Sequence, residues 1–362
     1  MRMRADGRVS PEPDTEATGG GPLAGIRILE VGTMLAGPYA TMMLADLGAE
    51  VTKLEPASGE ISRQVSDTYF ASLNRGKRSL VIDLTSPEGQ QRLGELVAES
   101  HALLVNLKPS AIRRLGLTFE ALRRWNERIV CVAITGFGLD GGDDPAFDYV
   151  VQASTGIAAM TGDPDGPPTL PGYSSADNST GLTAALGLLA QIVSGRGGQV
   201  DVSLYDVMLS QLNYHAAAYL GTGAEPRRRP FGAHSYYVPA QLFPTAEGHL
   251  ALFITHDGFW KTFAAEAGVG GFETMAERAS RREEVLDAVT AALATDTAAG
   301  WQNRLRPLGI PAAAVRTLPE ALAATPEAII TAGDFRLIRN PIKVAGYEHV
   351  YGPPPVLGEA GR

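Results

Sequence analysis

Strand-like and helix-like runs alternate along the first third of the chain, and this alternation restricts the possible folds more than any other feature. Apolar strand-like runs lie at 26–31, 51–55, 80–84, 102–106 and 129–134, with helical patterns between most of them. Strands joined through helices pair in parallel, because each crossover returns the chain to the same edge of the sheet. The sequence therefore predicts an α/β fold built on an open, doubly wound sheet.

A different pattern begins after residue 225. Strand-like runs at 236–244 and 248–255 form a predicted β-hairpin. Three helical patterns follow it, at 258–267, 281–293 and 297–306. A hairpin followed by helices is typical of an α+β arrangement and not of a parallel sheet. We therefore predict a second, smaller α+β domain in this part of the chain.

Composition excludes several classes of partner. The chain has 362 residues, a formal net charge of −9 and one cysteine, Cys131. The negative charge argues against nucleic acid or an anionic membrane as the main partner. No apolar run reaches the roughly 18 residues of a membrane span. Cys131 lies in an apolar run, so we expect it to be a small core residue. A single cysteine cannot form an internal disulfide, which fits a protein of the reducing cytoplasm.

Signatures of several enzyme classes are missing from the sequence. The six histidines are scattered without the spacing of zinc ligands, so no metal site is predicted. The absence of G-x-S-x-G argues against a serine hydrolase. The β-α-β unit at 26–55 imitates a dinucleotide fold, but Gly32 and Gly37 are separated by four residues and do not fit G-x-G-x-x-G. Carboxylates, N–H groups at glycines and a basic turn remain as candidate functional groups.

One carboxylate stands at the start of a long apolar run. A polar turn delivers Asp177 to residues 182–193, and the glycine-rich stretch 194–198 ends that run. The pattern predicts a helix that is buried on every face. At its start, unpaired N–H groups and the helix dipole favour negative charge. From the residues alone, Asp177 is either an ordinary N-cap or a carboxylate held rigidly for chemistry.

The turn 74–79 offers three cations in four positions, Arg75, Lys77 and Arg78. Two interpretations are open, a solvated basic turn and a seat for phosphate groups. The turn is not a Walker loop, because Ala71 occupies the place of the first glycine.

Short motifs of one family are distributed along the whole chain. In order they are Leu35-Ala36-Gly37-Pro38, Leu47-Gly48-Ala49, Lys53-Leu54-Glu55, Asn74-Arg75-Gly76-Lys77-Arg78-Ser79, Asp83-Leu84 with Pro87-Glu88-Gly89, Arg114-Leu115-Gly116-Leu117, Gly136-Phe137-Gly138, Ala176-Asp177-Asn178-Ser179-Thr180-Gly181, Gly195-Arg196-Gly197-Gly198-Gln199-Val200, Phe243-Pro244-Thr245-Ala246-Glu247-Gly248 and Pro355-Val356-Leu357-Gly358-Glu359. Each fragment is weak alone, but the ordered set is specific. With these motifs, the chain resembles the family III coenzyme A transferases, of the formyl-CoA and carnitine CoA-transferase type, over 22–359.

The resemblance implies a fold, an assembly and an activity. It implies a large Rossmann-like domain formed by 22–225 and 326–362, with a smaller domain at 226–325. Residues 1–21 lack the apolar core of a signal peptide and are predicted to be a disordered leader. Ring-shaped monomers interlock in this family, which implies a homodimer. The implied activity moves coenzyme A from an acyl-CoA to a carboxylic acid, with no permanently bound cofactor.

Asp177 matches the catalytic aspartate of this family. A carboxylate with a pKa near 4 is ionised at pH 7 and attacks a thioester without a general base. The resemblance implies an aspartyl acyl anhydride, followed by an aspartyl-CoA thioester. It also places a set of residues along the bound coenzyme A: Leu35, Ala36, Asn74, Lys77, Arg78, Asn106, Arg114, Gly136 and Phe137.

The sequence departs from the family pattern, and two other functions stay open. Pro56 stands where the family often has an arginine, and 229–235 holds one glycine where the formyl-CoA type has a glycine-rich flap. A 2-methylacyl-CoA racemase shares the fold but uses a histidine in a G-H-D triplet, which here reads Ala146-Phe147-Asp148. Phe147 cannot accept a proton. A non-catalytic CoA-binding subunit characteristically lacks the aspartate found here at 177.

Overall fold

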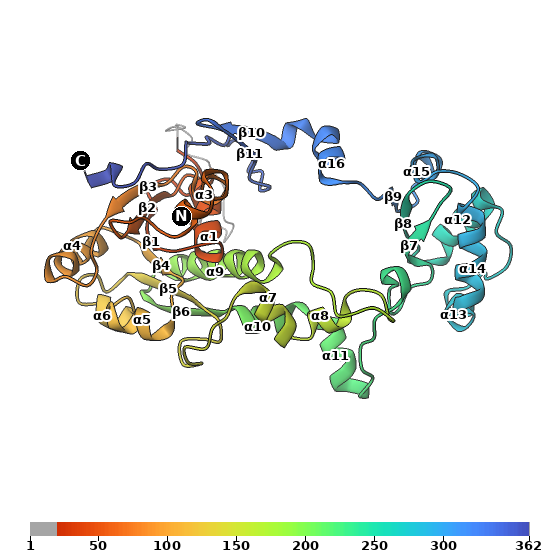
Figure 1. Cartoon of the computed structure of the whole chain (residues 1–362), viewed down its shortest axis with the longest axis horizontal. Helices are drawn as coiled ribbons and strands as arrows, with labels where there is room; N and C mark the ends of the chain where they lie inside the picture. The colour runs from red at the N-terminus through yellow and green to blue at the C-terminus, as the bar shows by residue number, and fades with distance from the viewer. Residues whose placement is uncertain (1–19, 362) are drawn as a thin grey trace, which may run out of the picture. The chain divides into compact units, whose positions relative to one another are not determined.

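The computed structural model describes residues 20–361 (Figure 1). All of the predicted leader, 1–21, except Gly20 and Gly21 lies outside the described residues. Within the described part the chain divides into two compact units. The first unit contains 20–145, 177–204 and 330–361, and the second contains 146–176 and 205–329. The predicted small domain, 226–325, falls inside the second unit, which also includes 146–176, 205–225 and 326–329, residues that the prediction gave to the large domain.

The first unit is built on a six-stranded sheet. Its strands are β1 (Arg27–Val31), β2 (Glu50–Glu55), β3 (Arg78–Val81), β4 (Ala102–Val105), β5 (Val130–Thr135) and β6 (Gly198–Ser203). They lie in the order β3-β2-β1-β4-β5-β6, and every pair is parallel. The predicted α/β fold with a doubly wound sheet is confirmed. The strand order reverses between β1 and β4, and ligands of such sheets bind outside the carboxyl ends of the strands at this point.

Helices cover both faces of this sheet. They are α1 (Ala36–Ala45), α2 (Ser62–Val65), α3 (Asp67–Asn74), α4 (Pro87–Ala98), α5 (Pro109–Arg114), α6 (Phe119–Leu122) and α9 (Ser175–Val193), the last belonging to this unit from Asp177 onward. Figure 1 shows α4, α5 and α6 on one side and α1 and α9 on the other. Leu93, Val97 and Ile112 pack with Leu103 and Cys131 in the core on the first side. Cys131 is a buried core residue as predicted, and burial raises the pKa of its thiol to about 12.

The chain ends with a short two-stranded sheet and a 3₁₀ turn. Strands β10 (Ile329–Ala332) and β11 (Phe335–Ile338) pair with each other, and η4 spans Glu359–Gly361. Ala332 and Leu337 pack against Ala71 of α3. The sequence had not predicted this sheet, nor α2 and α3.

The second unit holds an antiparallel sheet and several helices. The sheet has the order β7-β8-β9, with β7 (Ala240–Pro244), β8 (His249–Phe253) and β9 (Ala312–Ala314). The predicted hairpin is confirmed. The other elements are α7 (Asp148–Ser154), α8 (Ile157–Met160), α10 (Leu204–Gln211), α11 (Asn213–Thr222), η1 (Pro230–Gly232), α12 (Asp257–Ala267), α13 (Met275–Ser280), α14 (Arg282–Leu293), α15 (Ala298–Leu305), η2 (Arg306–Leu308), α16 (Leu318–Ala324) and η3 (Pro326–Ala328). Trp260, Phe263 and Trp301 form the centre of its core.

Helix α9 differs from its prediction in two respects. It begins at Ser175 and not at residue 182, so Asp177 lies inside the first turn and is not the N-cap. The helix is also not buried on every face. Leu188 is fully buried, but Leu182, Leu186 and Val193 are 46%, 69% and 86% exposed. The predicted C-terminal signal is confirmed, because the helix ends at Val193 and Gly195 has a φ of 70°.

No helix in the described part of the chain has both the length and the apolar character needed to cross a membrane.

The core of the first unit makes a prediction on stability. Leu103 of β4 is fully buried, so Leu103→Ala should lower the free energy of unfolding by about 2–5 kcal/mol. Val350→Ala is the control, because Val350 is 79% exposed and its loss should change the value by less than about 0.5 kcal/mol. Urea unfolding measures both. Equal losses in the two variants would contradict the placement of β4 in the core.

Candidate functional site

The turn between β1 and α1 lies at the point where the strand order reverses. Asn106, directly after β4, holds this turn by both ends of its amide. Its Oδ1 accepts a hydrogen bond from the Thr33 N–H at 2.8 Å, and its Nδ2 donates to the Thr33 carbonyl at 2.8 Å. Asn106 therefore positions the turn in this structure, and its predicted place along bound coenzyme A stays a prediction.

Helix α1 begins with N–H groups that its N-cap leaves uncovered. Leu35 is the N-cap and provides no side-chain hydrogen bond. The first-turn N–H groups of Ala36 and Gly37 have no intrahelical acceptor available to them, because a helix leaves its first N–H groups unpaired. Such groups carry partial positive charge and attract anions and developing oxyanions. Leu35 and Ala36 therefore stand where the prediction needs ligand-binding groups.

The first turns of α9 lie against the start of α1. A Cβ at Gly181 would lie 2.7 Å from the Ala36 carbonyl oxygen and 3.4 Å from the Ala40 nitrogen, so only glycine allows this approach. Asp177 is four residues before Gly181, and residues spaced by four share one face of a helix. Asp177, which is half-buried, is therefore carried on the face of α9 that meets α1.

Asp148 fixes the N-terminus of α9. Its Oδ1 accepts a hydrogen bond from the Ala176 N–H at 2.7 Å, and its other oxygen accepts one from the Gln152 amide. The first N–H groups of a helix have no acceptor within the helix, and the buried Asp148 provides one for Ala176. Asp177 is thereby relieved of the capping role that one interpretation of the sequence gave it.

Tyr69 of α3 is a candidate residue of the functional site that the sequence analysis did not predict. The pKa of its phenol is raised, first by burial and then by the negative charges of Asp177 and Glu60. The phenol therefore lies within the electrostatic range of Asp177. Tyr69 immediately precedes a run of small and apolar residues, and its own sequence context contains no signal of a functional group.

A buried ionic cluster lies beneath the turn and α1. Glu30 accepts hydrogen bonds from Lys53 at 2.7 Å and from Lys77 at 2.8 Å, and all three side chains are fully buried. Burial alone would raise the pKa of Glu30, but the two ammonium groups outweigh it and hold the pKa at about 2. Burial lowers the pKa of Lys77 to about 8, against the attraction of Glu30. This cluster joins β1, β2 and the residue before β3.

The surroundings of Lys77 argue against its predicted contact with a phosphate. Its ammonium donates to Glu30 at 2.8 Å, to the Pro38 carbonyl at 2.8 Å and to the Asn74 Oδ1 at 2.9 Å. An ammonium has three donors, so none is left for a ligand. Asn74 is also fully buried and donates to the Phe70 carbonyl. Lys77 therefore binds the backbone of the first turn of α1, and Asn74 holds Lys77 in place.

Arg78 and Arg114 are not brought to the turn. Arg78 begins β3 and lies opposite Thr52, and with Arg27 and Glu50 it lines a recess of about 280 Å³ at the amino ends of the strands. Arg114 is exposed at the end of α5. Its neighbour Arg113 contacts the loop after β5 instead, through the Leu139 carbonyl at 2.6 Å and Asp140 at 2.8 Å.

Gly136 and Phe137 do lie at the carboxyl edge of the sheet. They follow Thr135, the last residue of β5, and both are half-buried. The Thr135 Oγ1 accepts a hydrogen bond from the Gly138 N–H at 2.8 Å, which tightens the turn. Of the predicted residues, Leu35, Ala36, Asn106, Gly136 and Phe137 therefore share one edge, and Asp177 approaches it on α9.

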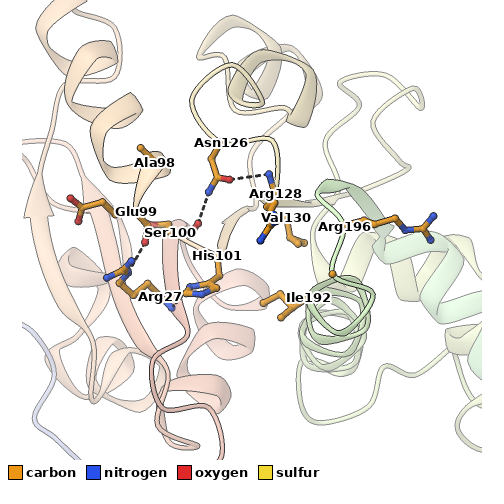
Figure 2. A pocket seen from close by; sticks show the side chains of 11 residues that line it. Arg27, Ala98, Glu99, Ser100, His101, Asn126, Arg128, Val130, Ile192 and Arg196 are labelled. Atoms are coloured by element: carbon orange, nitrogen blue, oxygen red, sulfur yellow. Dashed lines mark hydrogen bonds between the residues drawn. The ribbon is translucent and has the colours of Figure 1, made fainter. Parts of the chain in front are cut away.

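The opposite edge holds a recess of about 320 Å³ that contains none of the predicted residues (Figure 2). His101 lies there, and its Nδ1 accepts a hydrogen bond from the Arg27 N–H at 3.1 Å. Figure 2 shows Ile192, near the end of α9, beside this histidine. Ile192 is 15 residues beyond Asp177, or about 22 Å along a helix. His101 is therefore remote from Asp177 and cannot share a proton-transfer site with it.

Comparison with known proteins identifies the family of the chain. The family model described as CoA-transferase family III matches residues 23–360. The succinate–glutarate CoA-transferase of Agrobacterium fabrum is 36% identical over 269 residues, covering 69% of this chain and 67% of that protein. The acetyl-CoA:oxalate CoA-transferase of Acetobacter aceti is 30% identical over 373 residues, covering 96% of each. The crystal structure of a hypothetical protein from Mycobacterium tuberculosis has a TM-score of 0.85 at 28% identity, covering 94% of this chain and 98% of that one.

The chain belongs to CoA-transferase family III. It is an enzyme of the acyl-CoA:carboxylate CoA-transferase class, and its substrates are CoA thioesters.

The buried position of Lys77 makes a prediction that separates support from ligand binding. Lys77→Met should lower the free energy of unfolding by about 3 kcal/mol, because it breaks a buried ion pair. Calorimetry should find the affinities for CoA and dephospho-CoA changed by the same factor, because no N–H of Lys77 faces the 3′-phosphate. The control is Arg78→Ala, which removes an exposed cation. A loss of CoA affinity at least tenfold larger than that of dephospho-CoA in Lys77→Met would restore the phosphate contact.

Proposed function

We propose that the enzyme transfers coenzyme A through covalent intermediates on Asp177. The observation that carries this proposal is the placement of Asp177 in the first turn of α9, on the face that meets the start of α1. A carboxylate there lies near the first-turn N–H groups of α1, which the N-cap side chain does not cap, and it needs no general base. Two rigid helices fix its position relative to those donors.

The first half of the reaction forms and consumes an anhydride. The Asp177 carboxylate attacks the thioester carbonyl of the donor, the C–S bond breaks, and CoA leaves as a thiolate. The product is a mixed anhydride between Asp177 and the acyl group. The thiolate then attacks the Asp177 carbonyl carbon, the donor acid leaves as a carboxylate, and Asp177 carries CoA as a thioester. No proton needs to be transferred in either step.

The second half reverses these steps with the acceptor acid. The acceptor carboxylate attacks the Asp177 thioester, CoA leaves, and a new anhydride forms. The thiolate then attacks the acceptor carbonyl carbon and releases Asp177 as a carboxylate. Each tetrahedral intermediate bears an oxyanion, and the N–H groups of Ala36 and Gly37 are the donors we assign to it.

We place the CoA arm along the carboxyl ends of β1, β4 and β5. Leu35, Ala36, Gly136 and Phe137 lie along this edge, where open parallel sheets bind their ligands. The relatives named above act on glutarate, succinate and oxalate, which supports a small dicarboxylic acid as acceptor. A panel of these acids with acetyl-CoA and succinyl-CoA, read by mass spectrometry, identifies the pair.

We also propose a homodimer in which a second copy covers α9. Leu182 and Leu186 are one turn apart on one face of the helix, and they are 46% and 69% exposed in a single chain. Covering such apolar surface contributes about 25 cal/mol per Å². This exposed face supports the interlocked dimer that the family resemblance implies. We assign the enzyme to the cytoplasm, which the single, unpaired Cys131 supports.

Asp177→Ala tests the assignment of the nucleophile. Transfer should fall by at least a thousandfold, because the variant lacks the group that forms both covalent intermediates. The melting temperature and CoA affinity should stay near the wild-type values, since Asp148 and not Asp177 caps α9. Asp163→Asn, at an exposed turn, is the matched control. Transfer within tenfold of the wild type in Asp177→Ala would remove Asp177 from the mechanism.

The racemase alternative makes a distinct prediction. Racemisation needs proton-transfer groups on both faces of the α-carbon. Phe147 cannot supply one, Asp148 is engaged with Ala176 and Gln152, and His101 lies at the opposite edge of the sheet. The enzyme should therefore not exchange the α-proton of a 2-methylacyl-CoA in deuterated water without an acceptor acid. Deuterium incorporation at a catalytic rate that is lost in Asp177→Ala would replace the transferase proposal with the racemase.

A further inference from the structure

The turn that precedes α1 is held in a conformation that its sequence disfavours. Met34 has a φ of 60°, in the left-handed region that residues with a Cβ rarely occupy. It stands between Thr33 and Leu35, at the switch point of the sheet. Strained backbone of this kind persists only where surrounding groups fix it, and it is concentrated at functional sites.

Glu60 holds this turn through two hydrogen bonds. Its Oε2 accepts from the Met34 N–H at 3.3 Å and from the Thr33 Oγ1 at 3.1 Å. The first bond reaches the strained residue itself. Asn106 donates to the Thr33 carbonyl, which belongs to the same planar peptide group as the Met34 N–H. Asn106 and Glu60 therefore hold this peptide group from its two sides, and Glu60 is the side chain that binds its N–H.

Glu60 is itself fixed in place by a buried network. It is 6% exposed, and the same Oε2 accepts from the Ser62 N–H at 2.8 Å. Its Oε1 accepts from the Ser62 hydroxyl and lies 3.8 Å from the Lys53 ammonium. Its own N–H donates to Glu55 at 3.0 Å. These contacts hold the Glu60 carboxylate in place independently of the turn. The carboxylate therefore does not move with Met34 if the turn relaxes.

The turn leads directly to the N–H groups beside Asp177. Leu35 follows Met34, and the first-turn N–H groups of Ala36 and Gly37, which the Leu35 side chain does not cap, come next. If the Met34 peptide rotated to a relaxed conformation, the first turn of α1 would change direction and its N–H groups would move relative to α9. The Gly181 contact leaves no room for such a shift without separating the two helices.

We propose that Glu60 is a positioning residue of the transfer reaction, which holds Met34 in the left-handed conformation so that the start of α1 faces bound coenzyme A. This proposal rests on the proposed function, because it assigns the start of α1 to the bound ligand. Glu60 touches no substrate. It acts through the backbone of Thr33 and Met34.

The test compares Glu60→Ala with Glu60→Gln in the full-length protein. In Glu60→Ala, the amides of residues 34–37 should exchange with deuterium at least tenfold faster, and calorimetry with free CoA should find about a tenfold weaker affinity. Glu60→Gln keeps an acceptor oxygen for the Met34 N–H, so its affinity should fall less than threefold. Ser79→Ala is the control. Ser79 is fully buried and bonds Glu55 in the same network, but it does not touch the turn.

A second substitution separates positioning from general support. Glycine adopts a φ of 60° without strain. Met34→Gly in the Glu60→Ala background should therefore restore CoA affinity to within about threefold of that of Met34→Gly alone. A role of Glu60 in stability alone would not be rescued at Met34.

The outcomes separate this proposal from the function on which it rests. Unchanged exchange and CoA affinity in a folded Glu60→Ala, or no rescue by Met34→Gly, would overturn the positioning role. If Glu60→Ala does not fold, Glu60→Met fills the buried space and removes both bonds to the turn, and wild-type exchange rates and affinity in that variant would overturn it. Failure of the wild-type enzyme to bind CoA would contradict the proposed function instead, while the exchange rates would still report whether Glu60 holds the turn.

Discussion

The candidate site depends on the ion pairs of the buried Glu30 carboxylate with Lys53 and Lys77. Each of the two ammonium groups also donates a hydrogen bond to a backbone carbonyl next to the segment that connects β1 to α1. Lys53 donates to the Gly32 carbonyl at 2.8 Å, and Lys77 donates to the Pro38 carbonyl at 2.8 Å. The cluster therefore holds both ends of the segment that connects β1 to α1. Ionised groups are costly to bury, and this cost is offset because each charge has a partner and further hydrogen bonds.

The same segment is held from above by neutral and acidic side chains. Asn106 binds the Thr33 peptide groups, and Glu60 binds the Met34 N–H. The result is a fixed edge at the carboxyl ends of the strands, with first-turn N–H groups of α1 that the N-cap side chain does not cap. Helix α9 then brings Asp177 to this edge through the close approach at Gly181. Preorganised donors of this kind stabilise developing negative charge without having to rearrange during the reaction.

The sequence predicted the fold better than the surroundings of the candidate ligand-binding residues, for physical reasons. Alternating strands and helices leave a local pattern, so the parallel sheet could be predicted, and the motif around Asp177 is contiguous. The burial of Lys77 could not be predicted, because its partner Glu30 lies 47 positions earlier and no local pattern reveals a buried ion pair. Glu60 and the left-handed Met34 were missed for the same reason. The exposed face of α9 was missed because composition does not tell which element, or which chain, covers a helix.

Isotope transfer from the acceptor acid tests the central claim, that Asp177 is the nucleophile, most directly. In the proposed mechanism, the acceptor carboxylate oxygen becomes the bridging oxygen of the second anhydride. The thiolate then attacks the acceptor carbonyl carbon and leaves that oxygen on Asp177. After turnover with a carboxylic acid labelled with ¹⁸O, the side chain of Asp177 should gain ¹⁸O, located by fragmentation of the peptide that contains it, while Asp148 stays unlabelled. Turnover that labels no oxygen of Asp177 would contradict the mechanism.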